Sequence, residues 1–354
     1  MAADHDELYR AMCLCAARID AHVATVLACR PADGSARGVG RRGPAEVDLL
    51  LHYLPPYDWA AMHAFLARRA VPGVEFVDGD SYARSIELQG EQGSITVRRA
   101  PAENALRATV RFPSLAALPA IVARLRRVFD LAADIVPIGR HLARDPVLAP
   151  LVAARPGLRV PGAWDGFELA VRAILGQQIT VAGAIRLAGR VVGAYGMPLV
   201  DPDGTLTHLF PRPEAMTSTD SMLLNIPRAR AATLTAVARA LVADPELFEG
   251  AQGLEAFVRR LRTIRGVGEW TAQYIALRQL REPDAFPAAD IGLMRALTDA
   301  SGRRPIAREL LARAERWRPW RAYAAQHLWS AAADAGIARN GAQERHGGSP
   351  CPPD

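Results

Sequence analysis

A single carboxylate, Asp290, stands where the chain could present a fixed anion. It follows a loop that contains Pro283, Pro287 and two alanines, and it directly precedes the apolar run of residues 291–297. Because prolines interrupt a helix, Asp290 is predicted to lie at the start of a new one. An aspartate there is most often an ordinary N-cap. In a cleft of low dielectric, the same charge would also stabilise a positive charge that develops beside it.

Upstream of this loop, two glycines separate two helical patterns. Leu261 and Ile264 are spaced as on a helix face, the pattern breaks at residues 266–268 (Gly-Val-Gly), and apolar residues resume at helical spacing over residues 270–277. Such a turn is usually a helix C-cap. Glycines also let the backbone approach a ligand, and the free amides at a helix N-terminus suit an oxyanion such as a DNA phosphate. The hairpin is therefore a candidate phosphate clamp.

Taken together and in this order, these motifs resemble those of the helix-hairpin-helix DNA glycosylases, in particular the AlkA type of 3-methyladenine-DNA glycosylase II. The resemblance includes residues 270–272 (Trp-Thr-Ala) and the stretches 155–159, 172–177 and 317–329, and it covers roughly residues 53–335. It implies a monofunctional enzyme of base excision repair. Such an enzyme removes alkylated bases of the 3-methyladenine and 7-methylpurine type from double-stranded DNA.

The resemblance implies that Asp290 is the catalytic residue. Breaking an N-glycosidic bond builds positive charge on the sugar, which a nearby carboxylate stabilises, and the same group could orient the attacking water. Purines alkylated at N3 or N7 are already cationic leaving groups, so the reaction needs no strong general acid. The sequence near Asp290 offers no obvious one.

An aromatic pocket for the target base is implied in the same way. Trp270, Tyr274 and Trp329 match the pocket positions of the family, and Phe65 and Arg69 match residues that reach it from the first domain. A cationic base stacked on such rings would gain about 0.5–2 kcal/mol, which is enough for about a tenfold preference over a neutral base. Each of these aromatic residues, taken singly, is more often a plain core residue.

A base inside a duplex must be flipped out and the gap filled. Gln178 falls at the wedge position, where the best-known family member has leucine. Two further departures concern the pocket: Ala289 replaces an acid of that member and Ile291 replaces a tyrosine. The preference among alkylated, deaminated and etheno bases is therefore left open.

The hairpin supplies the other expected DNA contacts, at Gly266, Gly268 and Thr271. The resemblance also suggests a structural monovalent cation, held by the backbone carbonyls of Arg262, Ile264 and Gly266. The reaction itself is expected to require no cofactor.

Every residue in the Lys+Arg count is an arginine. The chain of 354 residues carries 43 Lys+Arg against 37 Asp+Glu, a net charge of +6, and it contains no lysine. This balance favours a polyanionic partner such as DNA. Bifunctional glycosylase/lyases of the family use a lysine where Trp270 stands, so the imine route of a lyase is excluded here. A non-catalytic helix-hairpin-helix DNA-binding protein is the remaining alternative.

Four cysteines, Cys13, Cys15, Cys29 and Cys351, lie near the chain ends without paired C-x-x-C spacing. We therefore expect no zinc and no iron–sulfur cluster. Residues 1–44 resemble a shortened, degenerate form of the zinc-binding domain of Ada-type repair regulators. No stretch approaches the ~20 apolar residues of a membrane span, so we expect a cytoplasmic protein without a membrane partner. We also expect a monomer.

The fold class expected is an α+β N-terminal domain followed by a mostly α, two-lobed helix-hairpin-helix body. Three segments alternate with period two and predict an antiparallel sheet, at residues 85–88, 94–98 and 106–112. The resemblance implies that this sheet belongs to a TATA-binding-protein-like domain. The predicted parts are a degenerate or disordered segment (1–44), the α+β domain (45–136), one α lobe (137–163 plus 286–336), a second α lobe with the hairpin (164–285) and a disordered tail (337–354).

Overall fold

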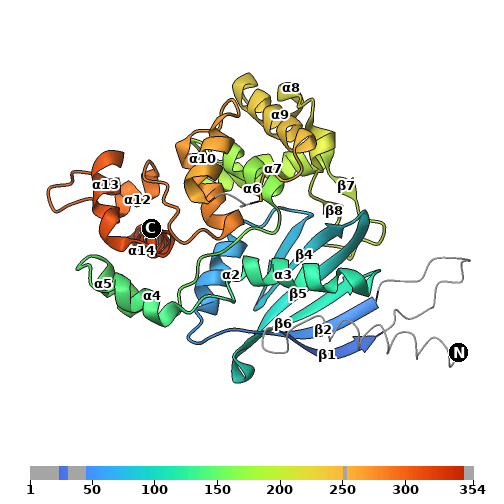
Figure 1. The fold of residues 1–354 in the computed structure, drawn as a ribbon, viewed down its shortest axis with the longest axis horizontal. Helices are drawn as coiled ribbons and strands as arrows, with labels where there is room; N and C mark the ends of the chain where they lie inside the picture. Colours follow the sequence, from blue (N-terminus) through green and yellow to red (C-terminus); the bar gives the residue numbers. More distant parts are fainter. Residues whose placement is uncertain (1–23, 31–44, 250–252, 347–354) are drawn as a thin grey trace, which may run out of the picture.

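An antiparallel sheet of six strands precedes a body of helices, which confirms the expected fold class (Figure 1). The structure is a computed structural model that describes residues 24–30, 45–249 and 253–346. The strands follow the order β1-β2-β6-β5-β4-β3 across the sheet. Their bounds are β1 Ala24–Arg30, β2 Ala45–His52, β3 Glu75–Asp78, β4 Ser81–Leu88, β5 Glu91–Ala100 and β6 Ala105–Phe112.

Two helices belong to this first domain, α2 (Trp59–Ala67) and α3 (Leu118–Val128). Asp58 caps α2 by accepting a hydrogen bond from the amide of Ala61 at 2.9 Å. In α3, the residues at helical spacing 118, 121, 122, 125 and 128 are buried in one apolar cluster with the sheet. The alternating residues 106, 108, 110 and 112 of β6 supply part of the opposite side of that core.

The helical body begins at residue 135, and its helices lie beside the sheet (Figure 1). Its elements are α4 Ile135–Leu142, α5 Leu148–Ala154, α6 Gly166–Leu175, α7 Val181–Tyr195, α8 Ser221–Leu224, α9 Arg228–Ala243, α10 Leu254–Arg262, α11 Glu269–Ile275, a π-helical turn Ala276–Leu280, α12 Ile291–Ala296, α13 Ala307–Ala314, and α14 Arg321–His346. No helix among the described residues is long and apolar enough to cross a bilayer.

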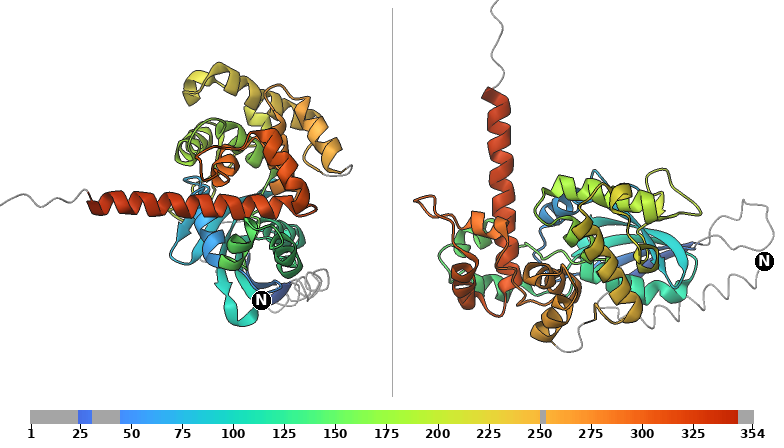
Figure 2. Two further views of the ribbon diagram at one scale, coloured as in Figure 1. Left: turned by 90° about the vertical axis from the view of Figure 1, so that its left-hand side faces the viewer. Right: turned by 90° about the horizontal axis from the view of Figure 1, so that it is seen from above.

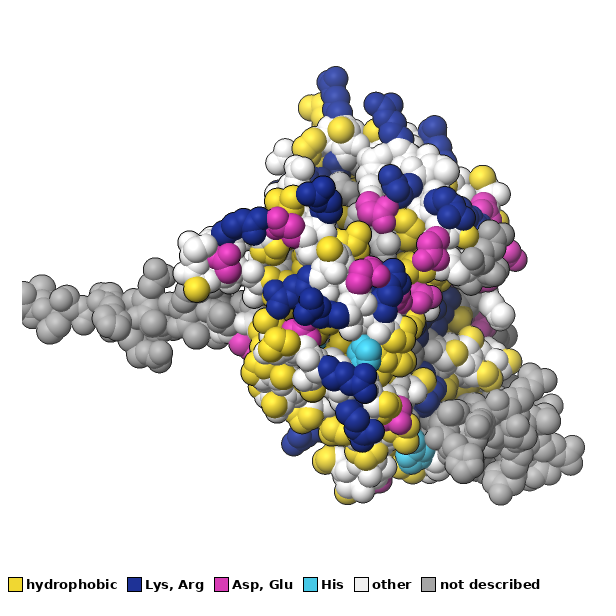
Figure 3. All heavy atoms as spheres, turned by 60° about the vertical axis from the view of Figure 1, so that its left-hand side comes forward, with side chains coloured by type: hydrophobic (Ala, Val, Ile, Leu, Met, Phe, Trp, Pro, Cys, Tyr) yellow, Lys and Arg dark blue, Asp and Glu magenta, His cyan; other side chains and the backbone are white. Residues whose placement is uncertain are grey.

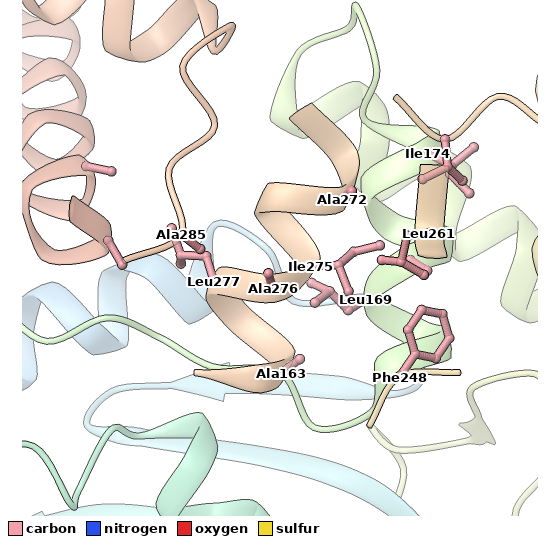
Figure 4. Packing of buried hydrophobic residues seen from close by; sticks show 14 of the residues in the cluster. Ala163, Leu169, Ile174, Phe248, Leu261, Ala272, Ile275, Ala276, Leu277 and Ala285 are labelled. Carbon is pink, nitrogen blue, oxygen red and sulfur yellow. The ribbon is translucent and has the colours of Figure 1, made fainter. Parts of the chain in front are cut away.

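Helix α11 lies at the centre of the body's core. Its buried residues Ala272 and Ile275 belong to one cluster with Leu169 of α6, Leu261 of α10 and Phe248 (Figure 4). Because α6, α10 and α11 all contribute to this cluster, the hairpin between α10 and α11 is anchored from both sides. The core thus fixes the segment that leads to Asp290.

A buried network of charges joins the sheet to the helical body. Arg84 of β4 and Arg172 of α6 each form an ion pair of 2.7 Å with Glu168, and Arg172 also pairs with Glu75 of β3 at 2.8 Å. Tyr82 donates a hydrogen bond to Glu75 at 2.7 Å. Since these carboxylates are almost completely buried, each one needs its partners to offset its lost hydration.

The structure corrects several of the sequence-based expectations. Three strands were predicted and six form the main sheet, with a further two-stranded ribbon, β7 (Met197–Pro198) and β8 (His208–Leu209), in the body. Residues 24–30 form β1 inside the segment 1–44 that was expected to be degenerate or disordered. Strand β1 pairs with β2, and the backbone hydrogen bonds of this pairing stabilise it. The sequence of residues 24–30 alone did not predict a strand. The rest of the Ada-like stretch lies outside the described residues.

The tail is the second correction. Residues 337–354 were expected to be disordered, but α14 continues to His346 and projects away from the rest of the molecule (Figure 2). Only two glycines, Gly336 and Gly341, interrupt this stretch, and single glycines weaken a helix by about 1 kcal/mol without ending it. Residues 347–354 lie outside the described residues.

Candidate active site

The carboxylate of Asp290 is held by three donors. Asp290 caps α12, and its Oδ1 accepts from the amide of Leu293 at 3.0 Å and from Trp329 Nε1 at 2.9 Å. Its Oδ2 accepts from Trp270 Nε1 at 2.8 Å. Asp290 is thus the N-cap that the ordinary interpretation predicts, and two tryptophans fix its orientation as well. Gly292 leaves the room for this, because a Cβ there would lie 2.9 Å from Oδ1.

Aromatic rings gather beside this carboxylate. Trp270 stacks on Tyr274 with 5.3 Å between ring centroids, and Tyr274 meets Trp329 edge-on at 6.2 Å. These three residues, with Phe65 of α2 and Arg69 just after that helix, line one cleft of about 1740 Å³ that also includes Asp290. The structure therefore brings together all five residues expected to form the pocket.

A buried arginine that the sequence analysis did not single out lies against the same rings. The guanidinium carbon of Arg278 is 4.6 Å from the centroid of Phe65, 4.9 Å from that of Tyr274 and 5.3 Å from that of Trp329. Burial raises the pKa of the Tyr274 hydroxyl, but the nearby charges of Arg278 and Arg69 outweigh it and leave that pKa below its ordinary value. No periodicity could have revealed Arg278, because the three rings come from separate elements.

The two glycines of the hairpin differ in their surroundings. Gly266 has a φ of +88°, and a Cβ there would meet Thr233 Oγ1 at 2.0 Å, so the turn requires glycine. Gly268 caps α11, and a Cβ there would meet nothing within 4 Å. The open space at Gly268, beside the free amides at the start of α11, is the feature that a phosphate contact requires.

The loop between α6 and α7 carries the expected wedge. Gln178 lies exposed in this loop with a φ of +60°. The neighbouring Gln177 donates to Thr271 Oγ1 at 3.1 Å and more weakly to the carbonyl of Gly266, and Arg230 donates to the carbonyl of Gln177 at 2.8 Å. Gln177, another residue missed from sequence, therefore ties the wedge loop to the hairpin.

Thr271 differs from the other expected DNA-binding residues. Its side chain is 2% exposed, and its hydroxyl already accepts the hydrogen bond from Gln177. The side chain of Thr271 therefore supports the wedge loop from inside. Because the whole residue is 2% exposed, Thr271 presents almost no surface to DNA.

The carbonyls suggested for a monovalent cation are partly engaged. That of Ile264 accepts from the amide of Val267 at 3.0 Å, and that of Gly266 accepts from Gln177 at 3.4 Å. A carbonyl oxygen has two lone pairs, so both retain capacity for a cation alongside the carbonyl of Arg262. Among the described residues, no group of three or more His, Cys, Asp or Glu could hold a metal ion.

On the face shown in Figure 3, basic side chains are spread among acidic and apolar ones. Arg260 and Arg262 lie near the hairpin, paired with Asp244 and Glu269 respectively. Both pairs are substantially exposed, so they contribute little to stability and the arginines remain available to a stronger anion. This distribution suits a surface that meets a polyanion.

Two protein families match the chain. Residues 48–165 match the AlkA N-terminal domain, and residues 171–322 match the HhH-GPD superfamily of base excision DNA repair proteins. The two matches correspond to the sheet domain with its helices and to the body that contains the hairpin. Together they cover most of the residues that line the cleft, while Trp329 and its neighbours in α14 lie beyond the second match.

Curated relatives and solved structures agree with these matches. The chain is 36% identical to DNA-3-methyladenine glycosylase 2 of Escherichia coli over 79% of this chain and 95% of that protein. It is 38% identical over 80% of its length to a Mycobacterium tuberculosis protein named "Probable bifunctional transcriptional activator/DNA repair enzyme AlkA", of which it spans 57%.

Among solved structures, the 3-methyladenine DNA-glycosylase of Archaeoglobus fulgidus has the same fold. It superposes with a TM-score of 0.70 at 23% identity over 79% of this chain and 96% of that one. One conclusion follows from the two domain matches, from the cleft between their elements and from the identity to nearly the whole of the E. coli protein. The chain belongs to the HhH-GPD superfamily of base excision DNA repair proteins, in the family that carries the AlkA N-terminal domain.

Proposed function

We propose that the chain is a monofunctional DNA glycosylase that excises alkylated purines from double-stranded DNA and works as a monomer. The observation that carries the proposal is the carboxylate of Asp290, oriented by Trp270 and Trp329 at the wall of an aromatic cleft. An anion held in this way stabilises the positive sugar of the transition state without reorganising. Oδ2 carries only one of the three hydrogen bonds, so it keeps the greater capacity to orient a water.

Hydrolysis then proceeds with water as the nucleophile. A lyase step would need an amine to attack C1′ and form an imine, and the sequence contains no lysine. Trp270 occupies the expected lysine position and donates to Asp290 instead. Guanidinium groups stay protonated and are poor nucleophiles. The product is therefore an intact strand with an abasic site.

The DNA contacts follow from the two loops at the mouth of the cleft. The amides near Gly268 bind a backbone phosphate, and Gln178 fills the gap left by the flipped base. A monovalent cation at the carbonyls of Arg262, Ile264 and Gly266 would stabilise the turn without taking part in the chemistry. These roles rest on exposure and geometry: Gln178 is exposed and the space at Gly268 is open.

The test combines base release with strand integrity. The protein is incubated with methylated duplex DNA, and released base, abasic sites and nicks are measured separately. We expect released 3-methyladenine or 7-methylguanine, abasic sites without nicks, and no adduct trapped by borohydride. DNA binding without any base release would instead favour the non-catalytic DNA-binding protein. A trapped adduct would contradict the monofunctional assignment.

A further inference from the structure

Arg278 is a buried cation at the base end of the cleft. It lies in the π-helical turn after α11, is 3% exposed, and lines the same cleft as Asp290. Three of the aromatic residues expected to receive the base surround its guanidinium within 5.3 Å, namely Phe65, Tyr274 and Trp329. Its charge is therefore held where a flipped base would be bound.

This cation has no carboxylate as a direct partner within the described residues. Arg278 donates to the carbonyl of Pro161 at 2.7 Å and weakly to Gln326 at 3.5 Å. Its Nε is buried and has no partner in the described part of the chain. Burial lowers the pKa of Arg278, but a guanidinium remains protonated at neutral pH. Among the described residues, no carboxylate forms an ion pair with Arg278, and Asp290 acts on its charge only from a distance across the cleft.

The aromatic rings are consequently not free to select cationic bases by cation–π attraction alone. Phe65, Tyr274 and Trp329 already contact Arg278, and Arg69 lies 4.0 Å from the centroid of Phe65. A cationic base entering between these rings would meet like charge from Arg278. The expected tenfold preference for cationic bases is therefore opposed by a repulsion that acts in the bound ground state.

The same charge favours the chemical step. When the bond between C1′ and the base nitrogen breaks, its electron pair stays with the base, so the charge of the base falls by one unit. A cationic base becomes neutral, and a neutral base becomes an anion that then takes a proton. In both cases a cation beside the base stabilises the change, while Asp290 stabilises the positive sugar until water adds to C1′ and releases a proton.

We propose that Arg278 sets the charge preference of the base pocket: it weakens binding of cationic bases and speeds departure of cationic and neutral bases alike. The inference rests on the proposed glycosylase function. It assigns the cleft two opposite charges, Asp290 at the sugar and Arg278 at the base, which together drive positive charge from the base to the sugar. A purely structural arginine would not produce this split between binding and rate.

The test compares Arg278→Met with the unaltered protein on two duplexes, one containing 7-methylguanine, whose nucleoside is cationic, and one containing neutral hypoxanthine. Single-turnover reactions at rising protein concentration give the maximal rate and the half-saturating concentration for each lesion. Arg124→Met is the matched control, because Arg124 lies 5.4 Å from the ring centroid of Trp164 and does not line the cleft. Arg278→Lys retains the charge but loses the planar fork of donors.

In Arg278→Met we expect the maximal rate to fall on the order of tenfold for both lesions. The half-saturating concentration should fall for 7-methylguanine and stay unchanged for hypoxanthine. Arg278→Lys should recover much of the unaltered pattern, and Arg124→Met should leave all four values unchanged. Melting temperatures measured alongside report whether each variant is folded.

Equal changes for the two lesions in half-saturating concentration, or an unchanged maximal rate in folded Arg278→Met, would overturn the inference. If Arg278→Met does not fold, Arg278→Lys decides the matter. If a folded lysine variant no longer shows the difference in half-saturating concentration between 7-methylguanine and hypoxanthine that the unaltered protein shows, the charge of residue 278 does not set that difference. Absence of base release by the unaltered protein on both duplexes would instead refute the proposed function, so the two failures are distinguishable.

Discussion

At the scale of single residues, Asp290 combines two roles that are usually separate. As an N-cap it satisfies the amide of Leu293, and as an anion it is held by the indoles of Trp270 and Trp329. The two indoles come from different helices, α11 and α14, so the orientation of the carboxylate depends on how these helices pack. Such positioning by rigid neighbours is what transition-state stabilisation requires.

Asp290→Asn should cut base release by roughly 10²-fold or more, because it removes the charge that stabilises the sugar in the transition state. Asparagine is as good an N-cap as aspartate, so the fold and the affinity for DNA should persist. Single-turnover release from methylated duplex DNA measures the rate, and binding to undamaged DNA is the control. Release close to that of the unaltered protein would refute the assignment of Asp290.

The sequence was sufficient to find Asp290 and the pocket aromatics but not Arg278 or Gln177. Asp290, Trp270 and Tyr274 lie close together in a motif whose order and spacing are specific. Arg278 is recognised as part of the site only through its contacts with rings on α2, α11 and α14. Gln177 is recognised only through its hydrogen bond to the neighbouring hairpin. Contacts between distant elements leave no pattern in a single sequence.

At the scale of secondary-structure elements, periodicity was a reliable guide to helices and a poor one to strands. The helices of the body lie where apolar residues recur every three to four positions, as in α9 and α10. In strand β2, burial alternates from Ala45 to Leu49, but the continuous apolar run Leu49–Leu51 then interrupts this pattern, and the strand was missed. Strands β1 and β3 were missed because an edge strand is defined mainly by the partner that it pairs with.

The hairpin offers a matched pair of variants. Gly268→Ala should leave the fold intact, since a methyl group there meets no protein atom, yet it should weaken affinity for all DNA sequences alike and flatten its salt dependence. Gly266→Ala should instead destabilise the protein, because its φ is +88° and the new Cβ would collide with Thr233. Melting temperature and DNA affinity at several salt concentrations separate the two effects.

A Gly268→Ala variant that lost only its preference for damaged bases, with total DNA affinity unchanged, would show that this turn does not bind phosphate. Gly266→Ala with an unchanged melting temperature would show that the turn tolerates a side chain. In that case the two glycines would not differ in their tolerance of a side chain.

At the scale of the whole molecule, stability should fall on the acid side because of His327. This residue of α14 is buried, and burial lowers the pKa of its imidazole to about 4 from an ordinary 6.5. The unfolded chain therefore takes up a proton first as the pH falls below 6.5. The folded state should lose about 3 kcal/mol between pH 6.5 and 4, a loss that is absent above pH 6.5.

Unfolding in urea at a series of pH values measures this loss. His327→Gln should remove most of the slope between pH 6.5 and 4, because glutamine does not titrate there. An unchanged slope in His327→Gln would assign the acid sensitivity to another group.

The buried network of Glu75, Arg84, Glu168 and Arg172 couples the sheet to the helical body. If one part unfolded, the charges of the other part would lose their partners, and each one that stayed buried would cost about 3–5 kcal/mol. We therefore expect the two domains to unfold together. Calorimetry should record a single transition whose van't Hoff and calorimetric enthalpies agree, even though two distinct domain families make up the chain.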